Sequence, residues 1–195
     1  MVGSQAVQVA VGMGARVTVL DRQIDRLRAL DMVFGNRIQT LMSTRESVAE
    51  SVANADVVIG SVLLPGSAAP KLVTHDMIRS MRAGSVVVDV AIDQGGCFET
   101  SHPTTHDEPT YVVDGVIHYC VANMPGAVAR TSTLALNNAT LPYAISLADH
   151  GWQQAMRHDP HLLAGLNVCN GQITHRAVAE SLNMTFTEPG QMLAS

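Results

Sequence analysis

Charge is scarce in this sequence, and positive charge is the scarcer sign. Lys and Arg number 12 among 195 residues, they form no cluster, and the formal net charge is −5. A nucleic-acid-binding protein needs a clustered basic surface, so we expect no nucleic-acid partner. Long apolar runs are also missing, because none reaches the roughly 18–20 residues that span a bilayer. We therefore expect no membrane partner, and the start "MVGSQ" lacks the basic and apolar regions of a signal peptide.

Cysteine and aromatic residues are few as well. The three cysteines, Cys97, Cys120 and Cys169, lie far apart, which excludes a disulfide framework and a zinc-binding spacing and indicates a reducing cytoplasm. Aromatic residues make up 4 % of the chain, although hydrophobic residues make up 47 %. Val, Ala, Leu and Met must therefore fill the core, as they do in parallel sheets that are buried on both faces.

The sequence does contain a regular alternation of two patterns. Helical patterns over 4–13, 23–35, 44–55 and 74–84 alternate with short β-branched runs typical of buried strands. The runs are "ARVTVL", "RIQTLM", "DVVIGSVLL", "SVVVDVAI" and "GVIHYCVANMP". This alternation predicts an α/β fold with a doubly wound parallel sheet.

The pattern changes near residue 128. The stretch "TSTLALNNATLPYAISLADHGW" predicts one long helix, broken or kinked near Pro142, and further helices follow at 152–159 and 174–184. We expect a nucleotide-binding domain over residues 1–128 and a helical segment over 129–195.

A glycine and an aspartate near the start favour dinucleotide binding. The fingerprint G-x-G-x-x-G lies between the first strand of such a fold and its helix, and Gly3 fits its third glycine. The earlier glycines and the strand before them would then precede Met1. Asp21 follows Gly3 by 18 residues, at the end of the next predicted strand. There a carboxylate accepts both ribose hydroxyls and repels a 2′-phosphate, which favours NAD over NADP, although the neighbouring Arg22 weakens that preference.

Each of these residues also has a plainer interpretation. Gly3 could be an ordinary glycine at a helix start, and Asp21 a surface residue that caps the next helix. Arg26 could lie against the adenine or extend into solvent.

Three later strand ends carry further candidates, because the carboxyl ends of parallel strands line the ligand crevice. Val62 and Leu63 could line the cofactor with backbone groups or belong to a plain connection. Asp93, before two glycines in "VVVDVAIDQGGCFE", would face the nicotinamide end, or be a turn residue. Asn123 could bind a substrate carboxylate or the cofactor, and Met124 could contact the nicotinamide or pack in the core. We assign no role to Asp89.

The histidines point to no metal site. His102 and His106 are four residues apart, a spacing that suits zinc on a helix, but Pro103 and the run "SHPTTHDEPT" indicate a loop. His118, within "VIHYCV", reads as a core histidine with satisfied hydrogen bonds.

Several long motifs in this chain resemble those of the bacterial alanine dehydrogenases. They are "VTVLD", "DVVIGSVLLPGSAAPKLV", "VVVDVAIDQGGCFETSHPTTH", "YCVANMPGAVARTSTLALNNATLPY" and "LADHGW". The resemblance covers essentially the whole chain. It implies a Rossmann-like NAD domain, a homohexamer, and the reversible NAD-dependent conversion of L-alanine to pyruvate and ammonia.

The resemblance also implies roles for individual residues. Asp21 would bind the adenosine ribose and Arg26 would lie by the adenine. Asp93 matches the catalytic aspartate, which orients water or substrate and assists proton transfer. The other positions expected around the cofactor and substrate are Gly3, Ser43, Val62, Leu63, Ile92, Asn123 and Met124. One departure is Ala129, at the domain hinge, where the family commonly has proline.

The resemblance further implies that a part of the enzyme is absent from this sequence. The substrate-binding arginine and lysine, the catalytic histidine and the first Rossmann strand belong to an amino-terminal half of the family's enzymes. The chain thus resembles a carboxy-terminal fragment, from a misassigned start or a broken or split gene, and we expect it to be inactive or nearly so alone. Residues 129–195 would pack on the missing catalytic domain. Two alternatives stay open: part of the nucleotide-binding subunit of a proton-translocating transhydrogenase, and a non-catalytic NAD-binding or assembly fragment.

Overall fold

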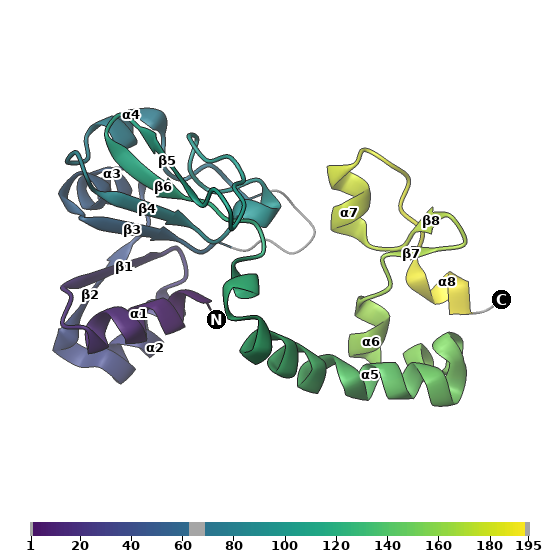
Figure 1. Cartoon of the computed structure of the whole chain (residues 1–195). Helices are drawn as coiled ribbons and strands as arrows, with labels where there is room; N and C mark the ends of the chain where they lie inside the picture. Colours follow the sequence, from purple (N-terminus) through teal and green to yellow (C-terminus); the bar gives the residue numbers. More distant parts are fainter. Residues whose placement is uncertain (1, 63–68, 194–195) are drawn as a thin grey trace. The chain divides into compact units, whose positions relative to one another are not determined.

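The computed structural model describes residues 2–62 and 69–193. The chain forms two compact units, and each is described by itself (Figure 1). The described residues of the first unit are 2–62 and 69–123, and those of the second are 124–193. The division between Asn123 and Met124 precedes α5, the long helix that begins at Ala129.

The first unit alternates helices and strands in the predicted order. Its elements are α1 (Val2–Gly12), β1 (Val17–Asp21), α2 (Ile24–Phe34), η1 (Gly35–Arg37), β2 (Ile38–Met42), α3 (Arg45–Asn54), β3 (Val57–Gly60), α4 (His75–Arg79), β4 (Val86–Asp89), η2 (Ile92–Gln94), β5 (Thr110–Val113) and β6 (Val116–Tyr119). Thr44 begins α3 with a capping box to Ser47, and the Thr74 hydroxyl accepts a hydrogen bond from the Met77 amide at the start of α4.

One strand of this unit, β5, is not among the strands predicted from the sequence. The strand β5 pairs antiparallel with β6 across a two-residue turn at Asp114 and Gly115, both at positive φ, 49° and 80°. An Asp-Gly pair between β-branched residues suits this hairpin turn, since both residues tolerate the left-handed conformation.

The strands form two separate sheets in the first unit. Strands β1 and β2 pair in parallel, and the second sheet has the order β3-β4-β6-β5, in which β3, β4 and β6 are parallel. No hydrogen bonds join β1 to β3. In a Rossmann sheet the first strand lies between the second and the fourth, which are the positions of β1 and β3 here. The predicted Rossmann-like sheet that lacks its first strand is therefore confirmed, and its neighbours have not closed the gap.

The core of the first unit lies around the four-stranded sheet. The fully buried side chains of Phe98, Ile78 and Val87 pack with Val116 into one apolar cluster. Phe98 is the largest of them, so one aromatic ring supplies much of the core volume in a chain that is poor in aromatics.

The second unit is mainly helical. Its elements are η3 (Met124–Val128), α5 (Ala129–His158), α6 (Pro160–Ala164), β7 (Val168–Cys169), β8 (Gln172–Ile173), α7 (Arg176–Ser181) and α8 (Pro189–Leu193). The expected break near Pro142 is wrong, because the helix continues through it and its backbone turns instead at Gly151, with φ 75°. Glycine adopts positive φ at no steric cost. The short hairpin β7–β8, with Asn170 and Gly171 at its turn, was not expected.

None of the helices within residues 2–62 and 69–193 has both the length and the apolar character needed to cross a membrane. The helix α5 nevertheless exposes several large apolar side chains, among them Leu134, Leu136 and Ile145.

Candidate functional site

Four of the parallel strands deliver candidate residues where they end. Because β3, β4 and β6 pair in parallel, the segments that follow them emerge at one edge of their sheet. These segments carry Val62, Asp93 and Asn123. At the end of β1, Asp21 lies beside the start of the segment after β2, because the Ser43 amide donates to the Asp21 carbonyl at 3.0 Å.

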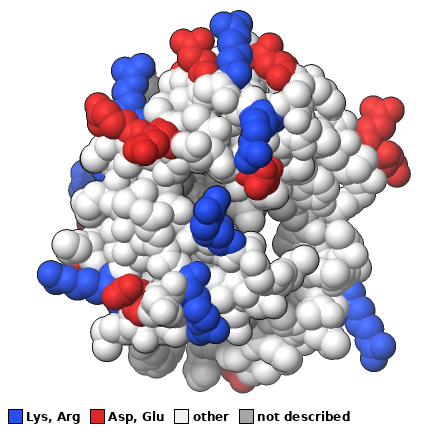
Figure 2. Space-filling model, turned by 90° about the vertical axis from the view of Figure 1, so that its left-hand side faces the viewer, with Lys and Arg blue, Asp and Glu red and all other residues white. Residues whose placement is uncertain are grey.

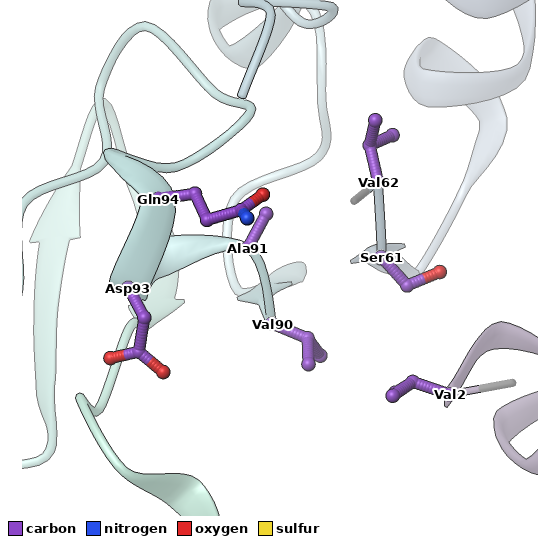
Figure 3. A pocket seen from close by; sticks show the side chains of 7 residues that line it. All are labelled: Val2, Ser61, Val62, Val90, Ala91, Asp93 and Gln94. Atoms are coloured by element: carbon purple, nitrogen blue, oxygen red, sulfur yellow. The ribbon is translucent and has the colours of Figure 1, made fainter. Parts of the chain in front are cut away.

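A pocket of about 120 Å³ lies at the carboxyl ends of β3 and β4. It is lined by Val2, Ser61, Val62, Val90, Ala91, Asp93 and Gln94. Figure 3 shows Ser61 and Val62 on one side of this space, and Asp93 and Gln94 on the other. The pocket thus brings together two of the predicted residues, Val62 and Asp93, and the first turn of α1.

The start of α1 approaches β3 closely at Gly3. A Cβ atom at Gly3 would lie 2.8 Å from the Ser61 hydroxyl oxygen, so a side chain there would force Ser61 to move. This close approach is what the third glycine of a dinucleotide fingerprint provides. The free amides of the first helical turn, next to the pocket, are suited to an anion.

The Asp21 side chain is held locally and stays partly exposed. One carboxylate oxygen accepts a hydrogen bond from the Gln23 amide at 2.8 Å, and the other lies 3.9 Å from an Arg26 nitrogen. The carboxylate is 30 % exposed, so it keeps acceptor capacity for a ligand. The long distance and the exposed position make the Asp21–Arg26 pair a weak one.

Asp93 lies in a short 3-10 turn, η2, followed by Gly95 and Gly96 at φ 88° and 76°. Its side chain is exposed at the pocket, whereas the neighbouring Ile92 side chain is buried. A contact of Ile92 with a cofactor would therefore have to use its backbone.

The remaining predicted residues lie outside the pocket lining. Asn123 has a positive φ of 57°, and its carbonyl faces the His106 ring nitrogen at 3.0 Å. Met124 belongs to the second unit, and Leu63 lies outside the described residues.

The structure adds Asp89, which has no role in the site predicted from the sequence. It ends β4, is fully buried, and accepts hydrogen bonds from the Ala91 amide at 3.0 Å, the Cys97 amide at 2.9 Å and the Ser101 hydroxyl at 2.6 Å. A lone aspartate within a buried apolar strand is the signal that could have indicated this, because a buried carboxylate needs several donors.

The structure also assigns a contact to Lys71, whose side chain binds the loop that carries Asp93. Its ammonium group donates to the carbonyl of Gly95 at 2.6 Å and to that of Phe98 at 3.1 Å. The Ala69 amide donates to the Gln94 carbonyl at 2.8 Å. The segment after residue 68 is thus tied to the loop that carries Asp93.

Burial shifts the pKa of three ionisable side chains near this loop toward their neutral forms. Burial, followed by the charge of Asp89, raises the pKa of Cys97 to about 12. Burial also raises the pKa of Tyr111 and lowers that of His118, because each charged form loses its hydration. The His118 ring contacts the Thr100 hydroxyl at 2.7 Å and the Val116 carbonyl at 3.0 Å, which confirms it as a satisfied core histidine.

Charge and metal-ligand chemistry add little to the site. No group of three or more His, Cys, Asp and Glu residues in the described part of the chain could hold a metal ion. On the face drawn in Figure 2, positive and negative side chains are interspersed among uncharged ones. The chemistry available at the pocket is therefore that of a helix start, the Asp93 carboxylate, the polar side chains of Ser61 and Gln94, and apolar side chains.

Comparisons with known proteins identify the family of this chain and relatives with the same fold. The family model "Alanine dehydrogenase/PNT, C-terminal domain" matches residues 1–176. An alanine dehydrogenase of Halomonas elongata is 59 % identical over 99 % of this chain, which covers 52 % of that protein. A solved L-alanine dehydrogenase has a TM-score of 0.83 at 49 % identity, covering 93 % of this chain and 50 % of its own.

A more distant match is the structure of a transhydrogenase from Sinorhizobium meliloti. Its TM-score is 0.58 at 33 % identity, and the match covers 68 % of this chain and 37 % of that one. The chain spans about half the length of the curated relatives that it matches.

Proposed function

Because the chain belongs to the family of the alanine dehydrogenase/PNT C-terminal domain, we propose that it forms the NAD-binding part of an alanine dehydrogenase. The reaction is the reversible oxidative deamination of L-alanine to pyruvate and ammonia. The observation that carries the proposal is the pocket that Asp93 lines together with Ser61 and Val62, beside the start of α1.

The residues present fit a dinucleotide. NAD, when bound, supplies the acceptor for the hydride that leaves the substrate. The amides at the start of α1 suit the pyrophosphate, since Gly3 leaves the backbone accessible where a Cβ would clash with Ser61. The partly exposed Asp21 carboxylate would accept the ribose hydroxyls, with Arg26 by the adenine.

The other cofactor contacts of the proposal come from the strand ends. They are Ser43, Val62, Leu63, Ile92, Asn123 and Met124. Ile92 would act through its backbone, because its side chain is buried.

Asp93 is the catalytic residue of the proposal. Its carboxylate is exposed at the pocket, and the parallel strand β4 directs the chain to that edge. A carboxylate there can orient water or the substrate amine and accept a proton from it.

The whole enzyme needs more than these residues. We propose that a further half of the protein supplies the groups that bind the substrate, and that residues 129–195 pack on it through the exposed apolar side chains of α5. The homohexamer is part of the same proposal. A cytoplasmic location is also proposed, since all three cysteines are free.

A chimaera tests this proposal. The chain replaces the matching half of the Halomonas elongata alanine dehydrogenase, and NADH formation is followed with alanine and NAD. We expect alanine-dependent NADH formation by the chimaera and none by the chain alone. A correctly assembled chimaera that binds no NAD would contradict the proposal.

The match to a transhydrogenase supports a second candidate, a nucleotide-binding piece of such an enzyme. This candidate predicts hydride transfer between NADH and an NADP analogue in an assay that contains no alanine. A third candidate, a non-catalytic assembly piece, predicts that the chain binds a full-length alanine dehydrogenase and changes no rate. The chimaera assay, run with and without alanine, separates the three candidates.

A further inference from the structure

The loop that carries Asp93 is anchored by one buried carboxylate. We define the 91–101 loop as the residues from Ala91 to Ser101. Both oxygens of Asp89 are occupied by donors from this loop: the amides of Ala91, Cys97 and Phe98, at 3.0, 2.9 and 3.4 Å, and the Ser101 hydroxyl at 2.6 Å. These donors come from the two ends of the loop, so Asp89 holds both ends to the terminus of β4.

Two glycines make this close approach possible. A Cβ atom on Gly96, at φ 76°, would lie 2.6 Å from an Asp89 carboxylate oxygen. A Cβ atom on Gly60 would clash with the Cys97 sulfur and come within 2.7 Å of the Phe98 ring. The loop backbone therefore lies directly against the carboxylate and against the end of β3.

Asp93 has no comparable anchor of its own. Its carboxylate makes no hydrogen bond to another residue in the described ranges 2–62 and 69–193, and its side chain is exposed. The place of the carboxylate at the pocket therefore depends on the backbone of the loop, which Asp89 organises.

We propose that Asp89 is a positioning residue for Asp93, which acts by holding the 91–101 loop and does not touch substrate or cofactor. The inference rests on the proposed function, in which Asp93 is the catalytic residue. A misplacement of about 1 Å at a reacting group can cost a hundredfold in rate, so a loosened loop has a large effect on turnover.

The test uses Asp89→Asn in the chimaera, with Val87→Ala as the matched control. Asparagine has nearly the same size but exchanges one acceptor oxygen for a donor, which faces amides that also donate. Val87 is fully buried on the same strand and shares the apolar cluster of Phe98, so its truncation weakens the apolar packing of β4 and the loop but removes none of the hydrogen bonds that hold the loop to Asp89.

We expect Asp89→Asn to lower kcat about tenfold or more, with KM for NAD changed less than about threefold. Val87→Ala should lower Tm and leave kcat unchanged in the folded enzyme. The double variant Asp89→Asn/Asp93→Asn should be no slower than Asp93→Asn alone, because both changes act through one group.

A milder variant covers the case in which Asp89→Asn does not fold. Ser101→Ala removes one of the donors and should give a smaller loss of kcat in the same direction. Hydrogen exchange of the chain itself supplies a readout that needs no activity: either variant should speed exchange of the Cys97 and Phe98 amides more than Val87→Ala does.

Two results would overturn the inference. One is a kcat for Asp89→Asn that equals the kcat of Val87→Ala, and the other is unchanged exchange in the loop. A failure of the proposed function has a different signature: Asp93→Asn would leave turnover near wild type, while loop exchange in the Asp89 variant still rises. That outcome also overturns the positioning role, because Asp93 would then have no reaction to serve.

Discussion

The two sheets of the first unit differ in how well they are buried. Among the described residues of the first unit, every side chain that is fully buried belongs to the four-stranded sheet or to the helix and loops packed on it, including Ile78, Val87 and Phe98. Around the β1–β2 pair, the most buried side chains are Leu27 and Val7, at 6 % and 8 % exposed. The proposed nicotinamide end of the site thus lies on the well-packed sheet, and the ribose end lies on the loosely packed pair.

This contrast has a structural cause. A strand between β1 and β3 would give each of them a second ladder of hydrogen bonds, and without it β1–β2 is a two-stranded sheet covered by α1 and α2. A two-stranded sheet is not stable by itself in water, so the stability of β1–β2 depends on the helices that pack on it. The nicotinamide end of the proposed NAD site is therefore held by the more stable sheet, and the ribose end by the less stable one.

Truncation of one large core residue packed beside each sheet should distinguish the two sheets most clearly. Phe98→Ala should lower the free energy of unfolding by about 3–5 kcal/mol, because it leaves a cavity in a rigid core. Leu27→Ala, in the looser region, should cost about 2–3 kcal/mol, at the lower end for a leucine. Urea unfolding followed by circular dichroism measures both, and equal losses would contradict the contrast.

Removal of the Asp93 carboxylate should lower the rate of the chemical step and leave the stability of the fold almost unchanged. In the chimaera, Asp93→Asn should reduce kcat about a hundredfold or more, the usual range for a general acid or base, with little change in Tm. The exposed loop carboxylate of Asp107 offers a control, since Asp107→Asn should leave kcat unchanged. Steady-state NADH formation reports both, and turnover of Asp93→Asn within a few-fold of wild type would remove Asp93 from the site.

Removal of the Asp21 carboxylate should act on affinity. Asp21→Ala should weaken NAD binding about tenfold, or about 1.4 kcal/mol, because the ribose hydroxyls lose a charged acceptor. Asp25→Ala, four residues later at the exposed start of α2, is the control. Titration calorimetry on the chain or the chimaera compares the two, and equal affinities would leave the ribose end without an assigned residue.

The smallest expected effect is a pH dependence that belongs to the well-packed sheet. Burial lowers the pKa of His118 from its ordinary value of 6.5. The unfolded chain therefore binds this proton more readily, and stability that is present above pH 6.5 is lost as the pH falls through the folded-state pKa. Urea midpoints at neutral and mildly acidic pH should fall less for His118→Gln than for wild type, whereas parallel shifts would assign the pH effect to other groups.

Much of the fold could be predicted because buried parallel strands are continuous β-branched runs. "VTVL" and "VVVD" show this pattern directly, and the helical patterns predicted from residues 44 and 74 begin at threonines that cap α3 and α4. The break of α5 lies at Gly151 and not at Pro142, because glycine adopts positive φ at no steric cost, whereas the helix continues through the proline. Both tight hairpins carry a local sequence signal, because Asp-Gly and Asn-Gly suit a two-residue turn.

The candidate site was predictable only in part. Asp93 could be found because it follows a buried strand and precedes two glycines, both local features. Asp89 and Lys71 act through partners up to 27 residues away, and spacing in one sequence does not reveal which donors meet a carboxylate in the fold. The resemblance to a family added Ser43, which neither burial nor spacing distinguishes from an ordinary surface residue, and favoured the adenine contact that the position of Arg26 had left open.

The cysteines have a practical consequence. Cys97 and Cys120 are 2 % and 0 % exposed, and the high pKa of the Cys97 thiol keeps it from forming the reactive thiolate, whereas Cys169 in the β7–β8 hairpin is only partly covered. A maleimide dye should therefore attach to the native chain at one position, in the second unit. That unit carries its own attachment point for fluorescence, and its docking onto a partner half can be followed without changing a single residue.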